Sequence, residues 1–138
     1  MSEIINDKNG ENKNAAKRIV DNGTRQEYIT GAHKEIQKGK GAFYLIPYEA
    51  MELLALRFEE GALKYGERDW EKGMPISDCV SSAMRHILKY AWGWNDETHL
   101  GAALWNIAAI CYYEKKHKDN KEVCNLPHHF KKKGEIKL

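Results

Sequence analysis

Residues 77–93 read SDCVSSAMRHILKYAWG and carry the clearest secondary-structure signal in the chain. Apolar residues return along this stretch at intervals of one and four positions, which is the spacing of one face of an α-helix. Ser77 offers a hydroxyl that can cap the first turn, and Gly93 provides a stop. The stretch therefore predicts an amphipathic helix whose buried face carries Cys79, Val80, Ala83, Met84, Ile87, Leu88 and Ala91.

A second helical pattern precedes this stretch and a third follows it. Pro47 suits the first turn of a helix, where its missing N–H is no loss, and Gly66 ends that pattern. The apolar face expected between them consists of Met51, Leu54, Ala55, Phe58, Ala62 and Tyr65. Asn95 or Asp96 can cap the third helix, for which we expect inward-facing Leu100, Leu104, Ile107, Ala108, Cys111 and Tyr112. Three amphipathic helices with short loops and no repeated strand signal predict an all-α fold, a bundle of three main helices.

The composition divides the chain into three parts. Residues 1–26 are rich in polar residues and poor in large apolar ones, so we expect a flexible N-terminal arm. Residues 27–117 should form the helical domain, and residues 118–138 a basic C-terminal tail. Within the domain, the apolar run 42–46 is compatible either with a brief strand or with an extended segment laid across the helices.

The third helix is apolar beyond its expected inward face. Its other faces carry Ala103, Trp105, Ala109 and Ile110. A helix that is apolar nearly all round needs cover on every side, and a second chain can supply it. We therefore expect a homo-oligomer, a dimer or larger, to complete the bundle.

Length, charge and cysteine usage exclude several classes of protein. The 138 residues fit one domain, and 22 Lys+Arg against 20 Asp+Glu leave a net charge of +2, which argues against a basic nucleic-acid coat. No apolar run approaches the roughly 18 residues of a membrane span, and the first residues lack the pattern of a signal peptide. We therefore expect a cytoplasmic protein, and the three widely spaced cysteines predict free thiols.

Carboxylates gather on the polar side of the first helix. Glu49 and Glu52 lie one turn apart, so they can share a face. Mg²⁺ takes oxygen ligands, usually one or two carboxylates together with water and substrate phosphates. The alternative is a solvated acidic face on which Glu60 pairs with Lys64.

The second helix places Arg85, His86 and Lys89 away from its expected apolar face. Arg offers a planar fork that matches phosphate oxygens, and Lys offers a point charge. His86 can donate to phosphate, bind a metal or stack. Alternatively, Arg85 pairs with a glutamate of the first helix and His86 is a hydrogen-bonded interface residue.

The turn into the third helix concentrates acidic groups, which capping and the helix dipole alone can explain. His99 nevertheless follows Asp96 by three residues, a spacing that lets both reach one metal or one water molecule. Asn106 lies two turns after His99 among apolar residues, where an unpaired amide costs roughly 1–3 kcal/mol. We therefore expect Asn106 to contact a base, a ribose or another helix.

The loop after the first helix combines aromatic rings with cations, in Lys64, Tyr65, Arg68 and Trp70. Stacking on a base together with a charge on a phosphate is a usual way to bind a nucleotide. Trp70 can equally fill the core under the loop. Near the C-terminus, Cys124, His128 and His129 have a loose zinc-like spacing but lack a second pair of thiolates.

Several of these motifs occur together, in order, over residues 24–115. They are Thr30-Gly31-Ala32, Gly39-Lys40-Gly41, Leu45-Ile46-Pro47, GALKYG at 61–66, WEKG at 70–73, SAMRHI at 82–87, DETHL at 96–100 and Trp105-Asn106. In this combination the chain resembles the phage and prophage dATP/dGTP diphosphohydrolase-like family, which is related to the all-α MazG-type nucleotide pyrophosphohydrolases.

The resemblance implies a Mg²⁺-dependent enzyme that splits a deoxynucleoside triphosphate into the monophosphate and pyrophosphate. It implies Glu49, Glu52 and Asp96 as catalytic metal ligands, joined by Glu97 from the same turn as Asp96. The nucleotide would be bound by Lys64, Tyr65, Trp70, Arg85, His86, His99 and Asn106. On this interpretation residues 27–117 are a nucleotide-binding domain.

The chain departs from the MazG-type pattern on its second helix. Residues 80–83, Val-Ser-Ser-Ala, supply no acid where such a helix carries one. This favours a second hypothesis, in which the chain is a phage anti-defence protein that sequesters a host immune signalling nucleotide in the host cytoplasm without cleaving it. A third hypothesis is a helical interaction module with no nucleotide ligand.

Overall fold

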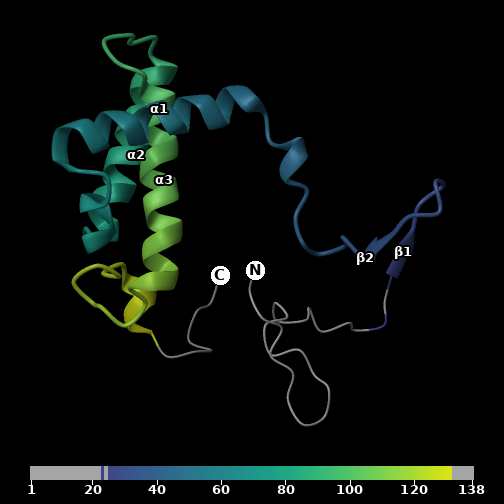
Figure 1. Ribbon diagram of the computed structural model, residues 1–138. Helices are drawn as coiled ribbons and strands as arrows, with labels where there is room; N and C mark the ends of the chain where they lie inside the picture. The colour runs from purple at the N-terminus through teal and green to yellow at the C-terminus, as the bar shows by residue number, and fades with distance from the viewer. Residues whose placement is uncertain (1–22, 24, 132–138) are drawn as a thin grey trace, which may run out of the picture. The chain divides into compact units, whose positions relative to one another are not determined.

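The structure is a computed structural model that describes residue 23 and residues 25–131 (Figure 1). Two compact units divide at residues 41 and 42. Most of the expected N-terminal arm and the last seven residues of the expected basic tail lie outside the described residues. The division of the chain at residues 26 and 117 stays a prediction.

The first unit contains a small β-hairpin that the sequence did not predict. Strand β1 (Arg25–Glu27) pairs antiparallel with strand β2 (His33–Glu35), and Gln26 lies opposite Lys34. The turn is closed by a hydrogen bond from the Gly31 amide to the Tyr28 carbonyl, 2.8 Å, and Gly31 has a φ of 84°. Such a backbone favours glycine, which explains the Thr30-Gly31 signal at this point. Three-residue strands are too short to show an alternating pattern.

The second unit contains the three expected helices, α1 (Tyr48–Tyr65), α2 (Ile76–Ala91) and α3 (His99–Lys116). Three short 3₁₀ helices accompany them, η1 (Phe43–Leu45), η2 (Asp69–Lys72) and η3 (Pro127–Phe130). Helices α2 and α3 pack side by side and α1 crosses them, so the mostly helical fold agrees with the all-α prediction (Figure 1). No helix in the described ranges is long and apolar enough to cross a membrane.

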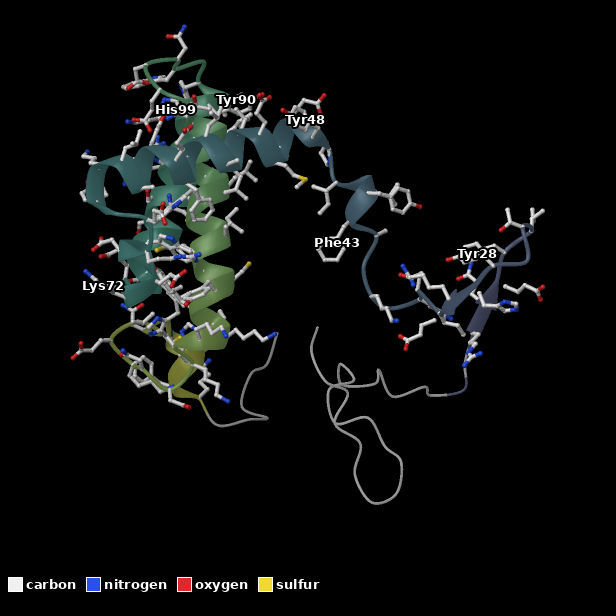
Figure 2. All side chains as sticks on the ribbon, viewed as in Figure 1. Tyr28, Phe43, Tyr48, Lys72, Tyr90 and His99 are labelled. Carbon is white, nitrogen blue, oxygen red and sulfur yellow. The ribbon has the colours of Figure 1, made fainter. Side chains whose placement is uncertain are left out.

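Residues 42–46 form neither of the structures that the sequence suggested. Phe43–Leu45 is the 3₁₀ helix η1, and the Phe43 ring projects from it with 75% of its surface exposed (Figure 2). The apolar run is therefore not buried across the helices in this chain. A short apolar run without periodicity does not distinguish a strand from a helical turn.

The core lies where α2, α3 and the segment after α3 meet. Its buried members are Ile76, Cys79, Ala109, Tyr113, Val123 and Cys124. The side chains packed around them include Trp70, Met74, Val80, Trp105, Ile110, Tyr112 and Leu126. Residues 123 and 124 belong to the segment expected to be a basic tail, so part of that segment is core instead. The three cysteines are free thiols, and burial raises the pKa of Cys79 and Cys124.

The segment after α3 also completes the start of α2. The Ile76 amide donates to the Val123 carbonyl, 2.8 Å, and the Ser77 amide donates to Asn125 Oδ1, 3.0 Å. These contacts satisfy N–H groups of the first turn that have no partner within the helix. The prediction that Ser77 itself caps α2 was wrong, because Pro75 occupies that position and the capping group comes from 48 residues downstream.

The predicted buried faces of the helices were only partly right. On α2, Cys79 and Ala83 are buried, whereas Met84, Ile87 and Leu88 are about half exposed. On α3 the buried face carries His99, Ala102, Ala103, Asn106, Ala109 and Tyr113, and not the face centred on Ile107 and Cys111. On α1 the half-buried positions include Leu53, Leu54, Phe58 and Ala62, and Met51 and Tyr65 are exposed.

The physical reason is clearest on α3. A helix that is apolar nearly all round has no single stripe that identifies its inner face. Small residues such as Ala102 and Ala109 let α2 approach closely, and two polar side chains, His99 and Asn106, are buried because they find partners there. Hydrogen bonding and close approach, and not hydrophobicity alone, select the packed face.

Candidate functional site

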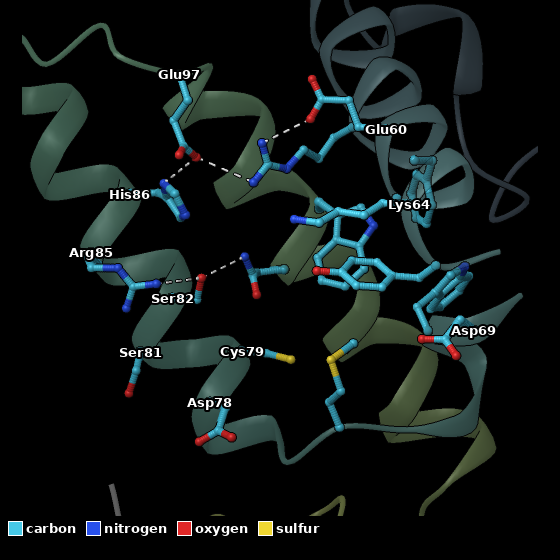
Figure 3. Close-up of a pocket in the computed structure, with 18 of the residues that line it drawn as sticks. Glu60, Lys64, Asp69, Asp78, Cys79, Ser81, Ser82, Arg85, His86 and Glu97 are labelled. Atoms are coloured by element: carbon cyan, nitrogen blue, oxygen red, sulfur yellow. Dashed lines mark hydrogen bonds and ion pairs between the residues drawn. The ribbon is translucent and has the colours of Figure 1, made fainter. Parts of the chain in front are cut away.

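A cleft of about 940 Å³ opens between α1, the η2 loop, α2 and α3 (Figure 3). Helix α1 contributes residues of its second half, and α2 contributes residues between Asp78 and His86. The side chains used below are Arg57, Phe58, Glu60, Lys64, Tyr65, Trp70, Ser82, Arg85, His86, Glu97, Trp105 and Asn106. The cleft is therefore assembled from segments up to 49 positions apart.

One wall of the cleft is aromatic. The ring centroid of Phe58 lies 5.3 Å from that of Trp70 and 6.1 Å from that of Trp105. Two residues of α3 fix the position of Trp70. The buried Tyr113 hydroxyl donates to the Trp70 carbonyl, 2.5 Å, and Tyr112 packs edge-on against the Trp70 ring, 4.8 Å between centroids. Such a wall offers flat apolar surface to a planar ligand.

Two cations in the cleft have no carboxylate partner among the described residues. Arg85 Nη2 donates only to Ser82 Oγ, 3.3 Å, and the Lys64 ammonium lies over the Tyr65 ring, 5.3 Å from its centroid. The ion pairs of the alternative interpretation, Arg85 with a glutamate of α1 and Lys64 with Glu60, are therefore not formed. Uncompensated cations beside aromatic surface attract anions.

A third cation is fully engaged. Arg57 Nη1 donates to Glu60 Oε2, 3.2 Å, and Arg57 Nη2 donates to Glu97 Oε1, 3.4 Å (Figure 3). The same oxygen of Glu97 lies 3.5 Å from His86 Nδ1. Arg57 thus links a carboxylate of α1 to a carboxylate of the turn before α3. Glu60 Oε1 and Glu97 Oε2 have no partner within the described ranges.

A chain of two hydrogen bonds, the first of them buried, leads from His86 through His99 to Asp96 in the turn before α3. His86 Nδ1 lies 2.9 Å from His99 Nδ1, and His99 Nε2 lies 2.7 Å from Asp96 Oδ1. The contact with His99 lowers the pKa of Asp96, and burial lowers the pKa of His86, although Glu97 opposes that shift. In the tautomer in which His99 Nε2–H donates to Asp96 and His99 Nδ1 accepts, His86 Nδ1–H donates to His99. This arrangement leaves His86 Nε2 as a hydrogen-bond acceptor in the cleft.

The structure brings together most of the residues predicted for the site. Those that line the cleft are Lys64, Tyr65, Trp70, Arg85, His86, Glu97 and Asn106. Asp96 and His99 join it through the hydrogen-bond chain from His86. Glu49 and Glu52 lie on the exposed surface of the first turns of α1 and do not line the cleft.

Sequence reasoning missed several cleft residues, among them the polar Arg57, Glu60 and Ser82 and the aromatic Phe58 and Trp105. Glu60 was considered only as the partner of Lys64 in the alternative interpretation. Ser82 was noted within the SAMRHI motif and as a position without an acid, but it was given no role in the site. Arg57 lies one turn before Glu60, a spacing that favours an ion pair, and this was the available signal. The contact of Arg57 with Glu97, 40 positions away, leaves no trace in local sequence.

Two groups of side chains have the composition of a metal site, with ligand atoms within 4.8 Å of one another. The first, His86, Glu97 and His99, belongs to the cleft. The second contains Glu114, Cys124 and His129, and covers the zinc-like spacing in the sequence. There the Leu126 amide donates to His129 Nδ1, 2.9 Å, so the ring proton sits on Nε2 and points at Glu114, 2.6 Å. To bind zinc through Nε2, the neutral ring would have to move its proton to Nδ1 and lose the bond from the Leu126 amide. In this arrangement the cluster connects the C-terminal segment to α3.

These features define a mostly helical protein with an aromatic cleft in which cations lie beside carboxylates, a combination that can bind a phosphorylated ligand, directly or through a metal ion. The family model described as dATP/dGTP diphosphohydrolase, N-terminal, matches residues 30–123. The chain belongs to this family, which confirms the resemblance found in the sequence motifs. No curated protein and no solved structure matches the chain.

Proposed function

We propose that the cleft binds a deoxynucleoside triphosphate and that the protein hydrolyses it to the monophosphate and pyrophosphate. The observation that carries the proposal is the pairing of Lys64 and Arg85, two cations without carboxylate partners, with the aromatic wall around Trp70. Membership of the family supports a nucleotide-related activity. In the reaction, water attacks the α-phosphorus, and the bond from that phosphorus to the bridging oxygen breaks.

The carboxylates at one end of the cleft fit a Mg²⁺ ion in their donor chemistry. Mg²⁺ prefers carboxylate oxygens together with water and phosphate oxygens, and Glu60 and Glu97 each keep one oxygen free. We propose these two residues as the ligands supplied by the cleft. When bound, the ion would neutralise charge on the phosphate chain and make a bound water more acidic. The assignment of Glu49, Glu52 and Asp96 stays a sequence-based prediction.

Other residues of the cleft would bind the phosphates and the base of the nucleotide. Lys64 and Arg85 hold phosphate oxygens, and Trp70 and Tyr65 border the base. The hydrogen-bond chain through His99 fixes the ring of His86 so that its Nε2 accepts a hydrogen bond from the ligand or from water. A fixed acceptor orients the group it contacts without a rearrangement during binding.

The direct test is to incubate the purified protein with dATP or dGTP and Mg²⁺ and to separate the products by chromatography. We expect the monophosphate and pyrophosphate in equal amounts. Recovery of unchanged triphosphate across a panel of nucleotides would contradict the proposal that the protein is a hydrolase.

Substitution of single carboxylates distinguishes the two metal-ligand assignments. Glu60→Gln should lower the rate at least about tenfold, the lower end of the loss seen when a metal site is perturbed. The matched control is Glu59→Gln, an exposed neighbour that does not line the cleft. A comparable loss in Glu52→Gln with none in Glu60→Gln would favour the sequence-based assignment instead.

One observation favours the second candidate function, in which the protein sequesters a nucleotide without cleaving it. Arg57 already pairs with both Glu60 and Glu97 and offsets one of their two negative charges, so the cleft depends less on a metal ion to bind an anion. A protein of this kind would bind its ligand equally well in EDTA and release it intact on denaturation. A phage source and an anti-defence role would go with this second candidate.

We also propose that a second copy of the chain covers the exposed apolar side of α2. Met84, Ile87 and Leu88 expose 61%, 46% and 54% of their surfaces on one helix. Contiguous exposed apolar side chains of this size usually mark a contact surface. Light scattering should give at least a dimer, and Leu88→Glu should shift it toward the monomer. A monomeric wild-type protein would contradict this proposal.

A further inference from the structure

Asn106 lies at the base of the cleft with its side chain almost wholly buried, 7% exposed. Its Nδ2 donates to the Ala102 carbonyl, 2.9 Å, and to Ser82 Oγ, 3.2 Å. A backbone carbonyl only accepts, so the amide nitrogen must lie on that side, and both of its hydrogens are used.

The orientation of the Asn106 amide is therefore fixed, and its Oδ1 can only accept a hydrogen bond. Oδ1 has no hydrogen-bond partner within residues 25–131, and among these residues no fully enclosed side-chain nitrogen or oxygen is left unpaired. Because Asn106 lines the cleft, Oδ1 is open to it. The sequence predicted that Asn106 needs a partner, and the structure satisfies its amino group and leaves its oxygen for a ligand.

The Ser82 hydroxyl, in contrast, is left with a hydrogen to donate. Its Oγ accepts from Asn106 Nδ2, 3.2 Å, and from Arg85 Nη2, 3.3 Å (Figure 3). A hydroxyl has two lone pairs and one hydrogen, so with both lone pairs occupied Ser82 can only donate. Asn106 and Ser82 therefore present a fixed acceptor next to a fixed donor.

This arrangement suits a nucleobase edge and not a phosphate. Phosphate oxygens are acceptors, so they would repel the exposed Asn106 carbonyl. The edge of a base instead carries an N–H group next to a ring nitrogen or a carbonyl oxygen, which complements an acceptor beside a donor. Trp105, the residue before Asn106, also lines the cleft and offers the base an aromatic surface.

We propose that Asn106 and Ser82 read the edge of the nucleobase, with Asn106 Oδ1 accepting from an N–H group and the Ser82 hydroxyl donating to the adjacent nitrogen or oxygen. The inference rests on the proposed function, because it requires a nucleotide in the cleft. It concerns recognition alone, so it holds whether the nucleotide is cleaved or only sequestered.

The test compares each nucleotide with an analogue that lacks the N–H group. Isothermal titration of the full chain, with Ca²⁺ in place of Mg²⁺, would use dATP against the triphosphate of deoxynebularine, which has no amino group, and dGTP against its N1-methyl analogue. A buried acceptor without a partner is costly, so we expect the analogue of the preferred base to bind at least about tenfold more weakly.

Variants assign that discrimination to the two residues. Asn106→Leu should bind the parent and the analogue alike, and Ser82→Ala should reduce the discrimination, whereas Cys111→Ala, an exposed position on the same helix, should keep it in full. Should Asn106→Leu fail to fold, Ser82→Ala and the wild-type comparison still decide the matter.

The possible contrary results distinguish a failure of this inference from a failure of the proposed function. Equal binding of parent and analogue by the wild-type protein overturns the inference but leaves the proposed function intact. A tenfold loss with 2′,3′-dideoxy nucleotides and none with the base analogues would show that Asn106 accepts from the sugar hydroxyl, which also overturns it. Absence of binding by every nucleotide overturns the proposed function as well.

Discussion

Substitution of Tyr113 by Phe should destabilise the protein through a single hydrogen bond. The Tyr113 side chain is fully buried, and its hydroxyl donates to the Trp70 carbonyl at 2.5 Å. This bond ties α3 to the 3₁₀ helix η2, which carries Trp70 into the cleft. Phe removes one oxygen and leaves the ring packing unchanged.

The size of the effect follows from what the substitution leaves behind. A hydrogen bond of this kind contributes about 0.5–1.5 kcal/mol, and an unpaired buried carbonyl costs about 1–3 kcal/mol. We therefore expect the free energy of unfolding to fall by about 1–3 kcal/mol. For a domain of this size the melting temperature should fall by roughly 4–8 °C for each kcal/mol.

Urea denaturation followed by circular dichroism measures the difference. Tyr112→Phe is the matched control, because this neighbouring ring packs against Trp70 and its hydroxyl makes no hydrogen bond within the described ranges. It should stay within about 0.5 kcal/mol of wild type, as substitutions away from such features usually do. Equal stability of Tyr113→Phe and Tyr112→Phe would refute the reasoning.

The same hydroxyl makes the stability depend on alkaline pH. Burial raises the pKa of Tyr113 to about 12, from an ordinary value near 10. The folded protein therefore favours the protonated phenol, whose contribution is complete below pH 10 and is lost as the pH rises through 12. The gap in stability between wild type and Tyr113→Phe should narrow over this range, and a constant gap would contradict it.

Two further predictions concern loops that shape the second unit, and both are measured by thermal unfolding. Gly73→Ala should lower the stability of the protein more than Gly66→Ala does. Both glycines have a φ near 100°, but only at Gly73 would a Cβ lie 2.8 Å from Val123 Cγ2. Equal losses of stability in the two variants would refute the predicted clash. Asn125→Ala should cost about 1 kcal/mol, the usual value of a lost helix cap, since its side chain satisfies the Ser77 amide at the start of α2. A variant as stable as wild type would show that water replaces the cap.

The sequence predicted the three helices through their apolar spacing, but the predicted start signals held only for α1. Helix α2 begins after Pro75 and not after Ser77, and α3 begins after Thr98 and not after Asn95 or Asp96. Pro47 and Gly66 bracket α1 as expected, and the apolar spacing after residue 77 identified α2. The packed face of α3 was predicted wrongly, since it depends on where His99 and Asn106 find partners on α2. Those partners lie 13 and 24 positions away, beyond the reach of helical periodicity.

The candidate site likewise combines residues that the sequence predicted with residues that depend on contacts distant in sequence. Lys64, Trp70 and Arg85 were selected by residue type alone, and the fold places all three around one cleft. Arg57 was missed because its role depends on Glu97, which reaches it only once α1 crosses α3. Residue type therefore predicted several of the side chains that meet in the cleft, and the positions of the carboxylates required the tertiary structure.

The most direct measurement is a crystal structure of the protein with a non-hydrolysable analogue of dGTP. The account predicts phosphate density within hydrogen-bond reach of Lys64 and Arg85, and the base between the aromatic wall at Trp70 and the side chain of Asn106. A nucleotide bound elsewhere on the chain, with this cleft empty, would contradict it.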